Sequence, residues 1–130
     1  MSPALERRFL QTSVAFAAAV PVGAGLRGLM FGLDAAGTFT DSHYRYLSGI
    51  LLAMGAAFWS VIPRIEDRAV VFRLLTALVV VGGLARLGAA LSSGLSQSVA
   101  AALTMELIIT PALCLWRERI ERMDPASQAE

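Results

Sequence analysis

The sequence predicts an all-α fold, an integral membrane four-helix bundle whose helices run antiparallel in up-down-up-down order. The chain has 130 residues, and hydrophobic residues make up 56% of them, with a mean hydropathy of +0.63. Soluble domains carry a smaller apolar share. The apolar residues form four segments, each near the roughly 20 residues that a helix needs to cross a bilayer, with short connections between them. We therefore expect one membrane domain, residues 1–130, with spans at about 9–31, 42–62, 70–91 and 98–116.

The first span, 9–31, follows a pair of arginines and contains Pro21 and Arg27. Proline inside a helix leaves the carbonyl four residues earlier without its partner and favours a kink. A secretory signal peptide begins in a similar way, with a basic start, an apolar stretch and small residues at a cleavage site. Because the apolar run continues well past the alanines at 17–19, a membrane span is the favoured interpretation.

Turn-forming and charged residues separate the later spans. Residues 34–41 are expected to form the first loop, and Pro63 to end the second span, because proline does not continue a helix. Residues 92–97 are an uncharged polar turn. The charged segment 117–122 marks the exit of the fourth span, and residues 123–130 are expected to be a flexible tail.

The basic residues, all of them arginines, predict the orientation. One side of the four-span arrangement collects Arg7, Arg8, Arg64, Arg68, Arg73, Arg117, Arg119 and Arg122. On the other side only Arg27 and Arg45 lie near the helix ends. Because cytoplasmic loops are enriched in arginine, both termini are expected to be cytoplasmic. The formal net charge is only +1, so nothing indicates a nucleic-acid partner.

Charged and polar residues within or beside the spans are the candidate ligand-binding residues. They are Asp41, His43, Arg45, Arg86, Glu106 and Arg27. With a rise of about 1.5 Å per residue, Arg86 lies about 10 Å and Glu106 about 15 Å below the outer loop, within reach of each other. Each of the three arginines and Glu106 shares its helix face with small residues, which indicates a face turned toward other helices. The four charges are therefore expected to turn toward one axis, in the outer half of the bundle.

Two interpretations of these charges stay open. In the first they are structural latches, Arg86 with Glu106 and Arg45 with Asp41, that fix the helix register. In the second the excess of positive charge lines an intramembrane pocket. Such a pocket suits an anionic or carbonyl-bearing head group, of a lipid-like or quinone-like molecule, whose tail lies between the helices.

Other residues give weaker signals. His43 is the only histidine and has no cysteine or histidine partner at metal-ligand spacing, so no metal site is expected. Cys114 is the only cysteine and is expected to be a small packing residue. Gly28 and Gly32 match the small-xxx-small pattern of helix packing, so a homodimer is a candidate assembly. Neither a catalytic residue nor a cofactor can be assigned from these patterns.

Three motifs occur in an order that resembles one protein family. They are Asp-Ser-His-Tyr-Arg-Tyr-Leu-Ser-Gly at 41–49, Phe-Arg-Leu-Leu at 72–75 with Gly-Gly-Leu-Ala-Arg-Leu at 82–87, and Met-Glu-Leu-Ile-Ile-Thr-Pro at 105–111. Together they look like the short bacterial four-helix membrane proteins grouped as domain of unknown function 4345. In that family Asn more often precedes the histidine, where this chain has Ser42. The resemblance implies the four-helix fold, a bacterial inner membrane location, and importance of His43, Arg45, Arg86 and Glu106, without an activity. A more distant similarity to small quinone-linked proteins of the DoxX and DoxD type rests on fold analogy alone.

These observations lead to three hypotheses for the function. The protein binds a lipid-like or quinone-like ligand, or it is an accessory subunit of a larger membrane complex. The alternative is a small membrane enzyme acting on a lipid or isoprenoid carbonyl, with Glu106 as general acid or base and Arg86 stabilising negative charge.

Overall fold

The structure, a computed structural model, describes residues 3–33 and 37–123. Within these ranges the chain forms α1 (Pro3–Phe31), α2 (Thr38–Val61), the 3₁₀ turn η1 (Ile62–Arg64), α3 (Ala69–Ser93), and a fourth helical stretch made of α4 (Gln97–Thr104), η2 (Met105–Ile109) and α5 (Thr110–Met123). Four of the described stretches are long and apolar enough to cross a membrane: Ala4–Phe31, Thr38–Arg64, Ala69–Ser93 and Gln97–Met123. The all-α, four-helix membrane fold is confirmed, and the up-down-up-down order across a bilayer stays a prediction.

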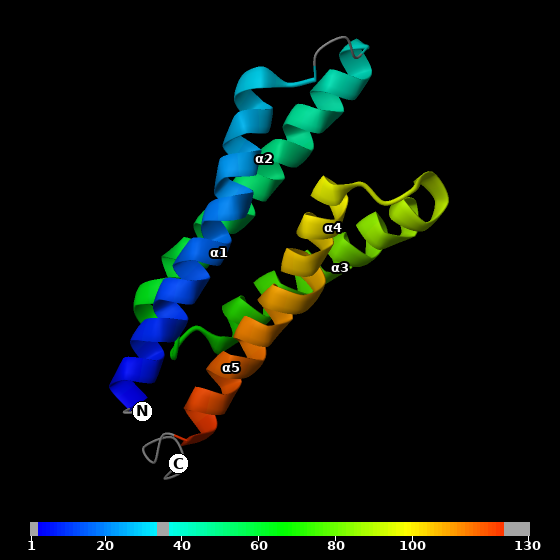
Figure 1. Ribbon diagram of the computed structural model, residues 1–130. Helices are drawn as coiled ribbons and strands as arrows, with labels where there is room; N and C mark the ends of the chain where they lie inside the picture. Colours follow the sequence, from blue (N-terminus) through cyan, green and yellow to red (C-terminus); the bar gives the residue numbers. More distant parts are fainter. Residues whose placement is uncertain (1–2, 34–36, 124–130) are drawn as a thin grey trace.

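The first hairpin consists of α1 and α2, which lie side by side (Figure 1). The indole N–H of Trp59 donates to the carbonyl of Ala15 (3.0 Å), and the guanidinium of Arg45 donates to the carbonyl of Leu29 (2.6 Å). Ala15 of α1 faces Trp59 of α2, and the later residue Leu29 of α1 faces the earlier residue Arg45 of α2. The two helices are therefore antiparallel. Gly25 permits the close approach, because a Cβ there would lie 2.6 Å from the backbone of both Leu52 and Ser48.

The second hairpin consists of α3 and the stretch from α4 to α5. Two ion pairs join its helices, Arg73–Glu118 (2.7 Å) and Arg86–Glu106 (2.9 Å). The later arginine of α3 pairs with the earlier glutamate, so these helices are also antiparallel. At Gly83 a Cβ would lie 2.9 Å from that of Glu106, so the absence of a side chain lets η2 approach α3. The two hairpins therefore share one construction, in which a glycine allows close packing and an arginine holds the facing helix.

The helix ends follow local chemistry. Gly32, with φ +62°, ends α1 in a left-handed conformation that glycine adopts without strain, and its N–H bonds the carbonyl of Gly28 (2.9 Å). α2 begins at Thr38, inside the predicted first loop, and Asp41 lies in its first turn, where a negative charge favours a helix. Pro63 falls in η1, just after the end of α2 at Val61. α5 continues to Met123, and the remainder of the predicted tail, 124–130, lies outside the described residues.

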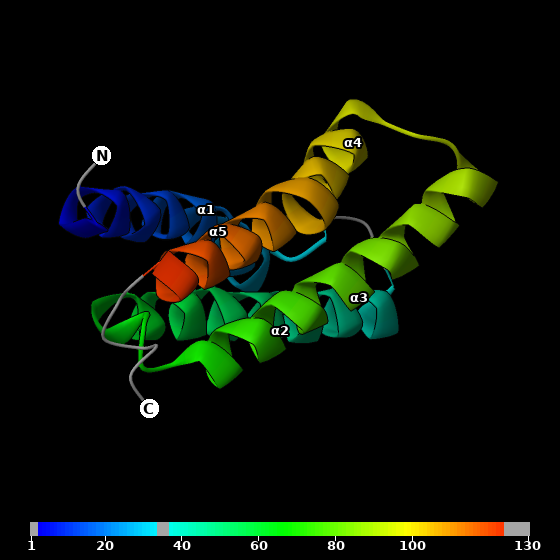
Figure 2. The ribbon, with the colours of Figure 1, turned by 90° about the horizontal axis from the view of Figure 1, so that it is seen from below.

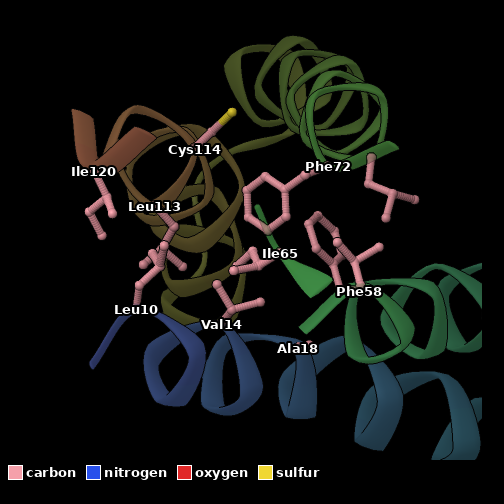
Figure 3. Packing of buried hydrophobic residues seen from close by; sticks show 11 residues of the cluster. Leu10, Val14, Ala18, Phe58, Ile65, Phe72, Leu113, Cys114 and Ile120 are labelled. Carbon is pink, nitrogen blue, oxygen red and sulfur yellow. The ribbon is translucent and has the colours of Figure 1, made fainter. Parts of the chain in front are cut away.

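The hydrophobic core gathers side chains from both hairpins (Figure 3), at the end of the molecule where the hairpins lie close together (Figure 1). Phe58 of α2 and Phe72 of α3 pack edge to face, with ring centroids 5.4 Å apart. The core is completed by Leu10, Val14, Ala18, Val61, Ile65, Leu75, Leu113, Cys114 and Ile120. Cys114 is buried there, in agreement with a packing role. We call this the junction end; here α1 begins, α2 ends, α3 begins and α5 ends.

Toward the opposite end the two hairpins diverge, as both views of the ribbon show (Figures 1 and 2). The hairpins touch through α1 with α5 and α2 with α3, while α4 packs against α3 of its own hairpin. We call this the splayed end; it holds the connections between α1 and α2 and between α3 and α4. The candidate residues from the sequence lie in this half of the molecule.

Candidate functional site

Arg86 of α3 and Glu106 of η2 form a two-pronged ion pair between the helices of the second hairpin. Nε of Arg86 donates to Oε2 of Glu106 (3.0 Å), and Nη2 donates to Oε1 (2.9 Å). Two parallel bonds of this kind fix geometry as well as charge. The side chain of Arg86 is 43% exposed and that of Glu106 18% exposed. The two side chains are therefore paired, and protein does not cover one side of the ion pair.

The backbone around Glu106 is a π-helical turn, wider than an α-helical one. Pro111 explains the position of this turn. Proline has no N–H to donate to the carbonyl four residues earlier, and its ring crowds that carbonyl. The N–H of Thr110 bonds the carbonyl of Met105, and its hydroxyl donates to the same oxygen (2.8 Å). Such turns inside helices are frequent at functional sites. The turn was not among the sequence-based expectations, and Pro111, shortly after Glu106, is its signal in the sequence.

Arg86 lies on the same face of α3 as the residues that this helix contributes to the hydrophobic core. On α3, Phe72, Val79 and Arg86 are seven residues apart and lie on nearly the same face. Phe72 is in the core and Val79 packs against it. Glu106 of the fourth stretch lies beside this face of α3 through its ion pair with Arg86. Arg86 and Glu106 thus stand beyond the core on the side that faces the first hairpin.

Arg45 and Asp41 form a second, separate cluster at the splayed end of the first hairpin. Nε of Arg45 donates to Oδ2 of Asp41 (2.8 Å), and Nη1 donates to the carbonyl of Leu29 (2.6 Å). Oδ1 of Asp41 accepts the N–H of Leu33 (2.7 Å). The pair satisfies backbone groups that the end of α1 leaves without partners. It therefore locks the end of α1 onto the start of α2.

An open groove of about 440 Å³ begins at Arg45. It is lined by Leu29, Arg45, Tyr46, Gly49, Ile50 and Ala53. All of these except Leu29 belong to one side of α2. The groove is shallow and its lining is almost wholly apolar, so the guanidinium of Arg45 contributes little to its surface.

His43 and Arg27 stay outside both clusters. The imidazole of His43 stacks on the ring of Phe39, with centroids 6.1 Å apart, and is exposed. Arg27 is exposed, and among the described residues no ion pair or hydrogen bond engages its side chain. The expectation of one shared axis thus becomes two ion pairs on two hairpins, with two single side chains beside them.

Arg117 is a buried charge that the sequence analysis assigned only to the membrane exit. Its side chain is 2% exposed, Nε donates to the carbonyl of Ile65 (2.7 Å), and Nη2 donates to the carbonyl of Glu66 (2.8 Å). Nη1 lies 3.0 Å from the carboxylate of Glu121. Arg117 follows the core residue Leu113 by four positions, and this spacing on one helix face was the signal for its burial. It joins α5 to the turn between α2 and α3.

Together, the helices and the charges within them define a small polytopic helical membrane protein. Across residues 3–33 and 37–123, no group of three histidine, cysteine, aspartate or glutamate side chains is placed to hold a metal ion. The chain belongs to the family described as domain of unknown function (DUF4345), whose sequence model matches residues 9–117. Comparison with curated proteins and with solved structures gives no match.

Proposed function

We propose that this chain is a bacterial inner-membrane protein that binds a lipid-like or quinone-like molecule through Arg86 and Glu106. The observation that supports it is the half-exposed ion pair on the core-forming face of the second hairpin. By the rise per residue, Arg86 lies about 10 Å from the end of α3 and Glu106 about 14 Å from the start of α4. A charged pair at that depth lacks water, so a polar partner over its open side would be favourable.

The ion pair offers complementary groups to a polar head group. Arg86 carries further N–H donors beyond the two used by Glu106, and each carboxylate oxygen can accept more than one bond. A carbonyl or anionic group would bind the free N–H groups, and a hydroxyl would donate to Glu106. The apolar tail would lie against the facing side of α2, where Leu47 is 49% exposed. Both termini would be cytoplasmic, because the junction end carries most of the arginines.

Native mass spectrometry of protein gently extracted from its own membrane tests this proposal, with Arg86→Leu as the variant. We expect a reproducible small-molecule adduct on the natural chain and none on the variant. A natural chain without any adduct would refute the proposal. Co-migrating protein subunits in place of an adduct would favour the accessory-subunit hypothesis.

Two glycines of α3 give a matched control that leaves the ion pair intact. Gly82 lies one turn before Arg86 on the same face, whereas Gly88 lies on the opposite side of the helix. A Cβ at either position would meet no atom within 4 Å, so neither glycine is needed for close packing within the hairpin. Gly82→Leu should displace the adduct and Gly88→Leu should retain it. Equal adducts on both variants would contradict a ligand on this face.

A third variant distinguishes an enzyme from a protein that only binds the ligand. Glu106→Gln keeps the shape of the side chain and a hydrogen-bonding group but loses the carboxylate. Conversion of the bound molecule by the natural chain, absent in Glu106→Gln although that variant still binds, would identify an enzyme. Unchanged ligand on both proteins would identify a binding protein.

A further inference from the structure

The ion pair of Arg86 and Glu106 has no net charge. Its guanidinium and carboxylate are joined by two hydrogen bonds, Nε to Oε2 (3.0 Å) and Nη2 to Oε1 (2.9 Å), so each charge compensates the other. On the same hairpin the other ion pair between helices joins Arg73 to Glu118. Arg73 lies about 20 Å along the helix from Arg86, so it contributes little to the potential at the site.

The positive charges of the first hairpin do not join this site. Arg45 is neutralised by Asp41 of its own helix (2.8 Å). Arg27 follows Gly25 by two residues, about 200° around α1, and Gly25 is a residue that packs on α2. Arg27 therefore lies on the side of α1 turned away from α2. Among the described residues no ion pair runs from the first hairpin to the site, so the excess of positive charge expected around one axis is absent there.

Both partners keep hydrogen-bonding capacity on the side that protein leaves open. A guanidinium has five N–H groups, of which Arg86 uses two for Glu106, and none of the described residues bonds the others. Each carboxylate oxygen of Glu106 accepts one of these bonds and can accept another. The site therefore presents N–H donors beside carboxylate acceptors, and a head group that carries a carbonyl and a hydroxyl satisfies both.

An anionic head group fits this site less well. A phosphate or carboxylate that bound the guanidinium of Arg86 would lie beside the carboxylate of Glu106, and the three charges together would keep one unbalanced negative charge. An unbalanced charge is costly inside a hydrocarbon layer, where water does not solvate it. A neutral head group makes the same hydrogen bonds without adding a charge.

We propose that the site selects neutral lipids whose head group carries carbonyl and hydroxyl oxygens, and that it excludes anionic phospholipids. Glu106 sets this selectivity, because its carboxylate cancels the charge of Arg86. Diacylglycerols carry both groups, and quinones carry carbonyls that become hydroxyls on reduction, so the two classes share the chemistry. The inference rests on the proposed function, since it concerns the ligand of the same two residues.

A matched pair of lipids tests the selectivity. Dioleoylglycerol and dioleoylphosphatidic acid have the same tails and differ by the phosphate, and a ubiquinone with two isoprenoid units represents the quinones. The protein in a non-ionic detergent receives each lipid at one concentration, and native mass spectrometry measures the bound share. Binding at the site is the share that Gly82→Leu loses and Gly88→Leu keeps, because Gly82 lies on the face of Arg86 and Gly88 does not. We expect site binding of dioleoylglycerol, of the ubiquinone or of both to exceed that of dioleoylphosphatidic acid about tenfold.

Glu106→Gln should remove the exclusion of anions, because it leaves the charge of Arg86 without a partner. Measured with the same two leucine substitutions, site binding of dioleoylphosphatidic acid should rise about tenfold over the natural chain. Asp67→Asn is the control. It makes the same change of net charge at an exposed residue that forms no ion pair within the described part of the chain, so site binding should stay as in the natural chain.

The outcomes separate this inference from the proposed function. Site binding of dioleoylphosphatidic acid that equals or exceeds that of the neutral lipids on the natural chain would overturn the selectivity and leave the ligand site standing. Adducts that Gly82→Leu does not lower for any of the three lipids would remove the site and the selectivity together. An unchanged preference in Glu106→Gln would show that the carboxylate does not set it. Circular dichroism checks folding, and should Glu106→Gln fail to fold, the comparison of lipids on the natural chain still decides.

Discussion

The two ends of the molecule use arginine in opposite ways. At the junction end Arg117 is 2% exposed, and its donors engage the carbonyls of Ile65 and Glu66. At the splayed end Arg86 and Arg45 are each paired with one carboxylate and are nearly half exposed. The buried guanidinium is enclosed by protein, and its Nη1, which makes no hydrogen bond, lies 3.0 Å from the carboxylate of Glu121; the exposed guanidinium groups have donors that the described residues do not use. The first arrangement joins α5 to the turn between α2 and α3, and the second leaves the donors that we propose for a ligand.

The comparison also shows where the fold is fixed. The residues of the hydrophobic core belong to the junction end, and the packing of α1 with α5 and of α2 with α3 serves that end, as does the contact of Arg117 with the turn after α2. Each hairpin has its own lock at the splayed end, Arg45 with Asp41 in one and Arg86 with Glu106 in the other. Each hairpin thus has its own contacts at the splayed end, and the two are joined at the junction end.

The largest expected effect comes from removing the buried charge at the junction end. Arg117→Met would leave the carbonyls of Ile65 and Glu66 without donors and should lower the free energy of unfolding by about 2–5 kcal/mol. Unfolding in mixed micelles with increasing SDS measures this. Arg119→Met is the control; Arg119 is exposed, so a change of less than about 0.5 kcal/mol is expected. Similar losses in both variants would mean that Arg117 is an ordinary interfacial arginine.

The next effect concerns the close contact inside the first hairpin. Gly25→Ala places a methyl group 2.6 Å from the backbone of Leu52, which forces α1 away from α2 and should cost about 1–3 kcal/mol. Gly23→Ala, with open space around it, should be neutral or slightly stabilising. The same SDS titration compares the two alanine variants. Equal stability would show that the helices separate at no cost.

A smaller loss is expected at the end of α1. Gly32→Ala must adopt φ +62°, which costs about 1–2 kcal/mol for a residue with a Cβ, and its methyl group collides with Asp41 and Arg45. Gly37, at φ −63° with nothing within 4 Å, is the matched position, and Gly37→Ala should not destabilise. Thermal unfolding followed by circular dichroism distinguishes the two variants. A stable Gly32→Ala would show that the lock at Arg45 is unnecessary.

The smallest effect is expected for the exposed pair on the second hairpin. Arg73 bonds Glu118 at 2.7 Å, but its side chain is 54% exposed, and solvent screens such pairs. Arg73→Gln should leave the unfolding midpoint unchanged within error. A clear loss would show that exposed pairs also contribute, and it would weaken the contrast between buried and exposed arginines.

Much of the candidate site could be predicted from single helices. Arg86 and Glu106 were paired by depth alone, and Asp41 and Arg45, four residues apart on one helix, were paired by spacing. Two features could not be predicted as easily. The separation of the two pairs depends on how the hairpins pack, which no local pattern records, and the groove at Gly49 depends on the position of Leu29 on another helix.

The sequence by itself determined the class of protein and the number of helices, because hydropathy and length are properties of each segment alone. It also determined which charges lie within the apolar stretches. Only the tertiary structure decided that the hairpins meet at one end and diverge at the other. That outcome depends on the large buried side chains, Phe58 and Phe72 among them, lying near the same ends of their helices, and on Arg117 filling the space between α5 and the turn after α2. Such contacts are made between segments distant in sequence, so they exist only in the folded chain.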